Sequence, residues 1–135
     1  PPEVPIVAVE ELREAYGMHY PDKRRRKSEL QAIFPTISFD YVKHEHDVYW
    51  KPDKRERMVG LYDRIHKFLK WVAHHFNEGQ TIMVVSHGLW MEYCFEMHDT
   101  KILQKHGRVY NCDVFAAQVV LKKQPPPLVS ISSQP

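Results

Sequence analysis

The sequence predicts an α/β domain, and three observations support that fold class. Residues 81–86 form a β-rich, mostly apolar run that leads into a polar Ser-His-Gly turn. An apolar-rich helical segment, residues 89–98, follows this turn directly. Farther upstream, residues 54–78 carry apolar side chains three and four residues apart, the spacing that buries one helix face.

The first predicted element is a short strand at residues 6–9. A helical turn or a loop is predicted over residues 10–16, and it ends at Gly17. Residues 18–52 contain three prolines, which indicates a long excursion with one short helix near residues 28–33. Excursions of this length in compact domains usually serve as lids or binding loops, so this segment is expected to shape a ligand site.

The strongest predicted helix spans residues 54–78. Asp53 is a good N-cap for it, and Glu56 stands at the capping-box position three residues on. Gly79 is expected to stop the helix, because glycine adopts the left-handed conformation that ends many helices. Beyond the helix at residues 89–98, a final strand is predicted at residues 113–122.

These elements predict one domain, residues 1–123, followed by a disordered tail rich in proline and serine at residues 124–135. A chain of 135 residues is long enough for one compact domain and too short for two. Its composition, 43% hydrophobic and 27% charged, is that of an ordinary globular protein. No apolar run approaches the roughly 20 residues that a membrane span requires, so no membrane partner is expected.

Charge and cysteine content narrow the possible partners and compartment. The formal net charge of +2 is too small to indicate nucleic acid as a partner. A basic run at residues 23–27 is the exception, and an RNA-binding alternative would rest on it alone and require strongly salt-dependent affinity. Cys94 and Cys112 favour reduced thiols in a cytoplasmic protein over a disulfide framework.

The Ser-His-Gly turn is the first candidate site. Ligands of open α/β sheets bind just outside the carboxyl ends of the strands, where His87 is expected. Backbone N–H groups at the start of the next helix favour phosphate, and Gly88 would let the backbone approach a ligand closely. A histidine that merely ends a strand is the competing interpretation, and the local pattern does not separate the two.

A series of motifs covers most of the chain. Leu-Arg-Glu precedes Gly17, Asp-Lys-Arg occupies residues 22–24, Phe-Pro occupies residues 34–35, and Ser-His-Gly closes the series at residues 86–88. In order and spacing the series resembles the histidine phosphatase superfamily, in its phosphoglycerate-mutase-like group. The resemblance extends over roughly residues 5–121 and implies a three-layer sandwich with a mainly parallel sheet.

The resemblance implies phosphoryl transfer or hydrolysis on a small phosphate ester through a phosphohistidine, without a cofactor. It implies that Glu14 is the proton donor and that His87 is a second catalytic histidine, which stabilises the transferring phosphoryl group. Glu11 competes with Glu14 if the register is shifted by three residues. Without the motif context, Glu14 would be interpreted as a solvated side chain on a short helix.

One departure from the family pattern is serious. The family opens with a strand that ends in Arg-His-Gly, whose histidine accepts the phosphoryl group, and this chain has no such motif. Its other His-Gly, at His106, follows a segment that does not resemble a buried strand. The chain is therefore expected to be the C-terminal, N-terminally truncated part of a longer protein, and to be inactive alone.

Two further expectations follow from the missing motif. A non-catalytic domain that binds a phosphate ligand or serves regulation is the alternative function. In the family, the Arg-His-Gly strand lies beside the strand that carries the second histidine. Its absence would leave the apolar run at residues 82–85 on an exposed sheet edge, through which the chain could self-associate.

Basic and histidine-rich segments give the remaining candidates. Arg24 or a neighbour in the basic run is expected to bind a substrate phosphate, because a guanidinium pairs with phosphate through two N–H groups, whereas a solvated loop is the ordinary interpretation of a charge run. His74 and His75 are adjacent on a helix and point about 100° apart, so they do not face one ion easily. His44 and His46 lack an obvious third ligand, so no metal site is expected.

Overall fold

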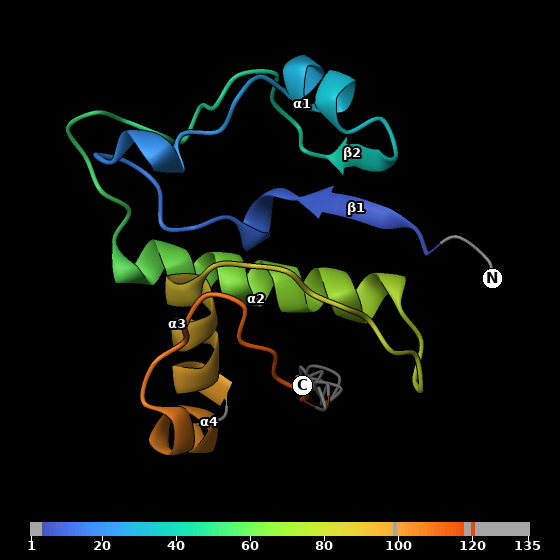
Figure 1. The fold of residues 1–135 in the computed structure, drawn as a ribbon, viewed down its shortest axis with the longest axis vertical. Helices are drawn as coiled ribbons and strands as arrows, with labels where there is room; N and C mark the ends of the chain where they lie inside the picture. The colour runs from blue at the N-terminus through green and yellow to red at the C-terminus, as the bar shows by residue number, and fades with distance from the viewer. Residues whose placement is uncertain (1–3, 99, 118–119, 121–135) are drawn as a thin grey trace, which may run out of the picture.

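In the part of the chain that the structure describes, four α-helices and two short 3-10 helices accompany a small parallel sheet (Figure 1). The structure is a computed structural model that describes residues 4–98, 100–117 and 120. The elements follow one another as β1 (Ile6–Val9), the short 3-10 helices η1 (Glu10–Leu12) and η2 (Tyr20–Asp22), α1 (Lys27–Ile33), β2 (Ile37–Tyr41), α2 (Met58–His75), α3 (Gly88–His98) and α4 (Thr100–His106). The predicted tail at residues 124–135 lies outside the described residues.

The sheet pairs β1 with β2 in parallel, with Ile6 opposite Ile37 and an irregularity before Val9. Parallel strands require a crossover of a dozen or more residues, which the segment from η1 to α1 supplies. The fold is therefore mixed α/β with a small parallel sheet, as the sequence predicts at the level of class. Within the described residues the sheet has two strands, fewer than a three-layer sandwich requires.

β1 confirms the strand predicted at residues 6–9, whereas β2 was not predicted. Its sequence alternates apolar and polar side chains, the period of a strand with one buried face, and Phe39 at its centre is buried. α1 confirms the short helix predicted near residues 28–33. Figure 1 shows β1 lying between β2 and α2.

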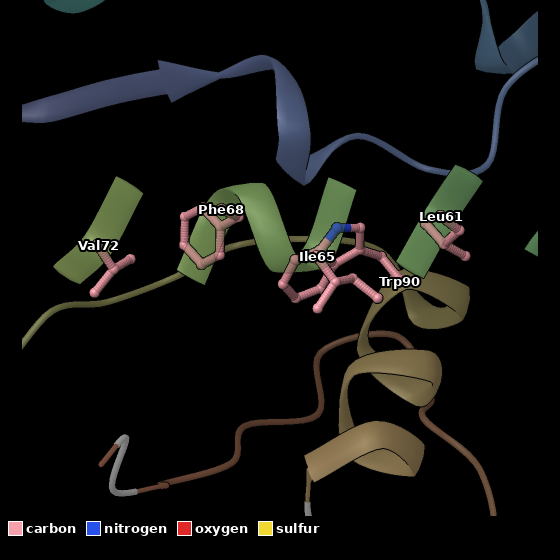
Figure 2. Close-up of a cluster of buried hydrophobic side chains, with 5 residues drawn as sticks. All are labelled: Leu61, Ile65, Phe68, Val72 and Trp90. Carbon is pink, nitrogen blue, oxygen red and sulfur yellow. The ribbon is translucent and has the colours of Figure 1, made fainter. Parts of the chain in front are cut away.

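The core is centred on α2, which the sequence predicts at residues 54–78. Leu61, Ile65, Phe68 and Val72 are buried along one face of the helix, at the predicted spacing. Trp90 of α3 joins them, with its ring 5.6 Å from that of Phe68 and nearly perpendicular to it (Figure 2). Burial of a side chain of this size contributes about 1.5–3 kcal/mol, so this cluster is the main stabilising feature of the fold.

Both ends of α2 differ from the prediction. The helix begins at Met58, because the backbone N–H of Glu56 donates to Tyr16 and its carboxylate binds Arg64, so Glu56 forms no capping box with Asp53. The helix ends at His75, three residues early. Phe76 leaves it in an extended conformation and packs against the core cluster.

Gly17 ends the first turn, as the sequence predicts. Its φ is +92°, and a Cβ at this position would lie 1.9 Å from the carbonyl oxygen of Lys54. Backbone hydrogen bonds on either side of Gly17, from Glu56 to Tyr16 and from Met18 to Lys51, hold the turn against the segment that precedes α2. A side chain at this position would force the two segments apart.

The strand predicted at residues 81–86 is absent, and this is the largest correction. Residues 81–87 have no regular secondary structure and hydrogen-bond to no strand that the structure describes. A strand requires a neighbouring strand to accept its backbone hydrogen bonds, and none of the described segments occupies that position. Ile82 packs against the core cluster, whereas Met83 and Val85 are 90% and 79% exposed.

The C-terminal part is helical for longer than predicted. α3 confirms the helix predicted at residues 89–98, and α4, which was not predicted, follows it. The predicted strand at residues 113–122 is wrong over residues 113–117, which have no regular structure, and most of its remainder lies outside the described residues. Phe115 packs on Phe95 of α3, with ring centres 5.1 Å apart, so this segment folds back over the helices and joins no sheet.

No helix in the described ranges is both long enough and apolar enough to cross a membrane.

Candidate functional site

Arg64 of α2 fixes the main chain of the Leu-Arg-Glu turn. Its guanidinium donates hydrogen bonds to the carbonyl oxygens of Glu11 at 2.8 Å, Arg13 at 2.9 Å and Glu14 at 3.4 Å. The same guanidinium binds both carboxylate oxygens of Glu56, at 2.8 and 2.6 Å. These two side chains are 11% and 2% exposed, so a nearly buried ion pair anchors the turn to the core helix.

The Ser-His-Gly segment binds the same turn from the other side. The Ser86 hydroxyl donates to the carbonyl oxygen of Leu12 at 2.7 Å, across 74 residues of sequence. The Trp90 indole donates to the carbonyl oxygen of Glu11 at 2.8 Å. The structure therefore brings together the two motifs that contain Glu14 and His87, although no strand pairing joins them.

Glu14 and His87 each keep polar groups that a ligand could bind. The imidazole of His87 is exposed, and its carbonyl oxygen accepts the first backbone hydrogen bond of α3, from Met91. Glu14 is half-buried, and one of its carboxylate oxygens accepts the backbone N–H of Ala15 at 2.8 Å. Among the contacts of the described residues, no hydrogen bond joins the two side chains. Their roles as proton donor and phosphate-binding group stay predictions.

Gly88 is tightly packed. A Cβ on Gly88 would meet the carbonyl oxygen of Val109 at 3.3 Å, a tight contact. The Glu92 carboxylate accepts the backbone N–H of Val109 at 3.0 Å, which fixes that loop against α3. The close approach that glycine permits at this position is therefore to the chain's own loop, and contact with a ligand stays a prediction.

Arg24 is the substrate-binding candidate, and its guanidinium already has protein partners. It donates to four main-chain carbonyl oxygens, those of residues 25, 44, 45 and 46. Its Nε also lies 3.2 Å from the Glu10 carboxylate. Binding of a substrate phosphate by this guanidinium would require some of these contacts to exchange, so that role too stays a prediction.

An ion pair between Arg13 and Asp47 was missed by sequence reasoning. The two guanidinium nitrogens of Arg13 donate to the two oxygens of Asp47, at 2.9 and 2.6 Å, and the Asp47 side chain is fully buried. Burial alone would raise the pKa of Asp47. The hydrogen bonds from Arg13 and from the backbone N–H groups of Arg24 and Trp50 outweigh that effect and hold it well below its usual range.

This pair fastens the loop around Asp47 to the residue that precedes Glu14. A second pair, between Arg55 and Asp22, acts in the same region, and Arg55 also donates to the carbonyl oxygen of Gly17 at 3.1 Å. No local periodicity could have revealed either pair, because their members are 34 and 33 residues apart. The only available signal was that Arg13 and Asp22 belong to the Leu-Arg-Glu and Asp-Lys-Arg motifs.

The remaining candidates are the possible metal ligands and the second His-Gly, at His106. Over the residues that the structure describes, no three His, Cys, Asp or Glu side chains gather as metal ligands would. His106 lies at the end of α4, with its ring 5.5 Å from that of Phe115. It is exposed, and its ring partner belongs to the C-terminal loop.

Comparison of the sequence with known protein families identifies the family to which the chain belongs. The family described as the histidine phosphatase superfamily (branch 1) matches residues 2–116. The chain belongs to this superfamily. The match covers most of the chain and confirms the resemblance carried by the Leu-Arg-Glu and Ser-His-Gly motifs.

Relatives within the superfamily come from Arabidopsis thaliana. The chain is 30% identical over 121 residues to phosphoglycerate mutase-like protein 1, an alignment that covers 86% of this chain and 42% of the relative. It is 39% identical over 83 residues to a phosphoglycerate mutase-like protein, covering 62% of this chain and 30% of that relative. The chain thus spans less than half the length of these relatives. No solved structure matches the chain significantly.

Proposed function

We propose that the chain is part of a histidine phosphatase that transfers or hydrolyses the phosphoryl group of a small phosphate ester. One observation carries the proposal: Ser86 and Trp90 fasten the turn that leads to Glu14 to the segment that carries His87, while Arg64 holds the same turn on α2. Convergence of an acid and a histidine from distant segments is what phosphoryl transfer requires of a protein scaffold. Membership of the superfamily supports the same reaction class.

In the proposed mechanism, His87 donates a hydrogen bond to an oxygen of the transferring phosphoryl group, and the N–H of Gly88 assists it. The ester P–O bond breaks as a bond forms between phosphorus and a histidine nitrogen. Glu14 gives its proton to the departing alkoxide. Water then attacks the phosphohistidine while Glu14 takes a proton from that water, so the acid is regenerated.

The nucleophilic histidine is not among the predicted site residues of this chain, because no Arg-His-Gly occurs in the sequence. We propose that it comes from a part of the protein outside these 135 residues. In that larger protein, the apolar run at residues 81–86 would be a central strand of a three-layer sandwich. Its exposed side chains in the present structure support that assignment.

The expected setting of this function is the cytoplasm. Cys94 and Cys112 are both free, which is ordinary for a protein of a reducing compartment. The proposed partner is a small phosphorylated substrate, with neither nucleic acid nor membrane involved. Self-association through the 82–85 run is proposed for the chain on its own.

A non-catalytic domain that binds a phosphate ligand is the second candidate function. The absent Arg-His-Gly motif favours it, because a general acid and a phosphate-binding histidine only assist an attack that another group makes. Such a domain would keep the anchored Glu14 and His87 segments and bind the ester without cleaving it.

Hydrolysis of an aryl phosphate separates these functions. The purified 135-residue chain is expected to show no turnover. If it does show turnover, and that turnover disappears in His106→Ala, then His106 is the nucleophile and the proposal that the nucleophile lies outside these residues is wrong. In a longer protein that contains an Arg-His-Gly segment, Glu14→Gln and His87→Ala are each expected to lower kcat about 10²-fold or more. The matched controls Glu78→Gln and His74→Ala change exposed residues and should retain full turnover. Unchanged kcat in both site variants would exclude the proposed catalytic roles.

A further inference from the structure

A basic cavity lies beside η2 and α1, and its wall includes Arg24, the predicted substrate-binding residue. Its volume is about 710 Å³, within the range of small-molecule sites. Four consecutive basic residues, Lys23 to Arg26, line it together with His46, and neither Glu14 nor His87 belongs to its wall. The two carboxylates in the wall, Asp47 and Glu29, do not balance this charge, as their contacts show.

Asp47 and Arg24 have their partners within the protein. Asp47 accepts hydrogen bonds from the Arg13 guanidinium and from the backbone N–H groups of Arg24, Tyr49 and Trp50. Arg24 donates to the surrounding carbonyl oxygens and faces Glu10. Both residues line the cavity, and contacts within the protein compensate their charges.

The other three cations lack equivalent partners. Arg26 approaches Glu29 only to 3.8 Å, with both side chains more than half exposed, and such a pair contributes little. Arg25 makes no ion pair within the described part of the chain. The Lys23 ammonium lies 4.9 Å from the centre of the Trp50 ring, which orients it through a cation–π contact and leaves its N–H groups unused.

We propose that this cavity is a binding site for the phosphate group of a small, multiply charged ligand, held by Lys23, Arg25 and Arg26. Uncompensated cations around a concave surface raise the local concentration of anions, and a guanidinium matches phosphate through paired N–H groups. Three such cations are too few for the 6–10 phosphate contacts typical of a protein that binds duplex nucleic acid. The proposed binding requires neither Glu14 nor His87, because neither of them lines the cavity.

Calorimetric titration of the 135-residue chain with inorganic pyrophosphate at low ionic strength tests the proposal. Arg25→Gln/Arg26→Gln is expected to weaken binding at least tenfold. The matched control, Lys67→Gln/Lys70→Gln, removes the same charge from exposed positions of α2 and is expected to stay within twofold of the parent. Equal weakening in both double variants would show that binding depends only on the overall charge of the chain, and it would refute the cavity as a specific site.

Two further measurements keep the outcome independent of folding defects. Pyrophosphate is expected to shift the backbone NMR signals of residues 23–26 and 46 in the unmodified chain. In His87→Ala the shifts of residues 23–26 and 46 are expected to persist, because His87 does not line the cavity, whatever the outcome for the proposed catalysis. Binding that survives Arg25→Gln/Arg26→Gln but is lost in His87→Ala would place the anion at His87 and exclude the cavity as its site. Absence of any binding at millimolar pyrophosphate would also exclude it.

Discussion

Arg64 binds both oxygens of the Glu56 carboxylate, although Glu56 precedes α2 and Arg64 lies on its second turn. The same guanidinium reaches three carbonyl oxygens of the Leu-Arg-Glu turn. One side chain therefore joins the start of the core helix to the segment that carries the proposed acid.

Glu56→Ala is expected to destabilise the chain by about 3–5 kcal/mol, because it leaves the Arg64 charge nearly buried without its partner. Urea denaturation monitored by circular dichroism measures the change. Glu29→Ala, which removes one member of the exposed Arg26–Glu29 pair, is the control and should cost less than about 1 kcal/mol. Similar losses in the two variants would mean that Arg64 is solvated in solution.

Asp47 predicts a specific dependence of stability on pH. Its pKa is lower in the folded chain than in the unfolded one, so its stabilising contribution is complete above the ordinary Asp pKa of about 4 and disappears as the pH falls further. The free energy of unfolding of the parent minus that of Asp47→Asn should therefore shrink between pH 6 and pH 3. Asp63→Asn, on the exposed face of α2, should change stability by less than about 0.5 kcal/mol at pH 6. A pH-independent difference for Asp47→Asn would contradict the buried ion pair.

The two cysteines should react at different rates. Burial raises the pKa of Cys94 to about 11, whereas Cys112 is exposed. Because the thiolate is the reactive form, a disulfide reagent at pH 8 should modify Cys112 quickly and Cys94 slowly. Cys112→Ser should abolish the fast phase, and Cys94→Ser should preserve it. A fast phase that instead disappears in Cys94→Ser would show that α3 separates from the core.

The exposed run at residues 82–85 predicts concentration-dependent self-association. Met83 and Val85 are 90% and 79% exposed, and extended apolar segments of this kind associate through backbone and side chains together. The average mass from light scattering should rise with concentration, and Met83→Lys/Val85→Lys should suppress that rise. Val114→Lys, at an equally exposed valine outside the run, is the control. A parent chain that stays monomeric at all concentrations would refute the prediction.

Helices were more predictable than strands in this chain. Local spacing in the sequence is enough to predict which face of α2 is buried, the face that carries Leu61, Ile65, Phe68 and Val72. The run at residues 81–86 has equally strong local β character, yet a strand also depends on a distant segment for its hydrogen bonds. β2 was overlooked although its alternation was visible, because the preceding prolines suggested an irregular excursion.

For the candidate site, the sequence supplied the motifs and the structure supplied their connections. Glu14 and His87 were selected by resemblance. Their segments are held by Arg64, Ser86 and Trp90, which donate hydrogen bonds to main-chain oxygens. Every residue has a main-chain oxygen, so the sequence does not indicate which residues accept these bonds. Asp47 was likewise hidden, because its partner Arg13 lies 34 residues away and the residues around Asp47 form no distinctive local pattern.

The anchors at the Leu-Arg-Glu turn bind backbone oxygens, so these hydrogen bonds do not depend on which side chain occupies residue 14. Substitution of Glu14 would therefore remove the proposed acid while these backbone anchors of the turn remain. Evolution could convert a catalyst built on this scaffold into a ligand receptor, or reverse that change, one side chain at a time and without passing through an unfolded ancestor.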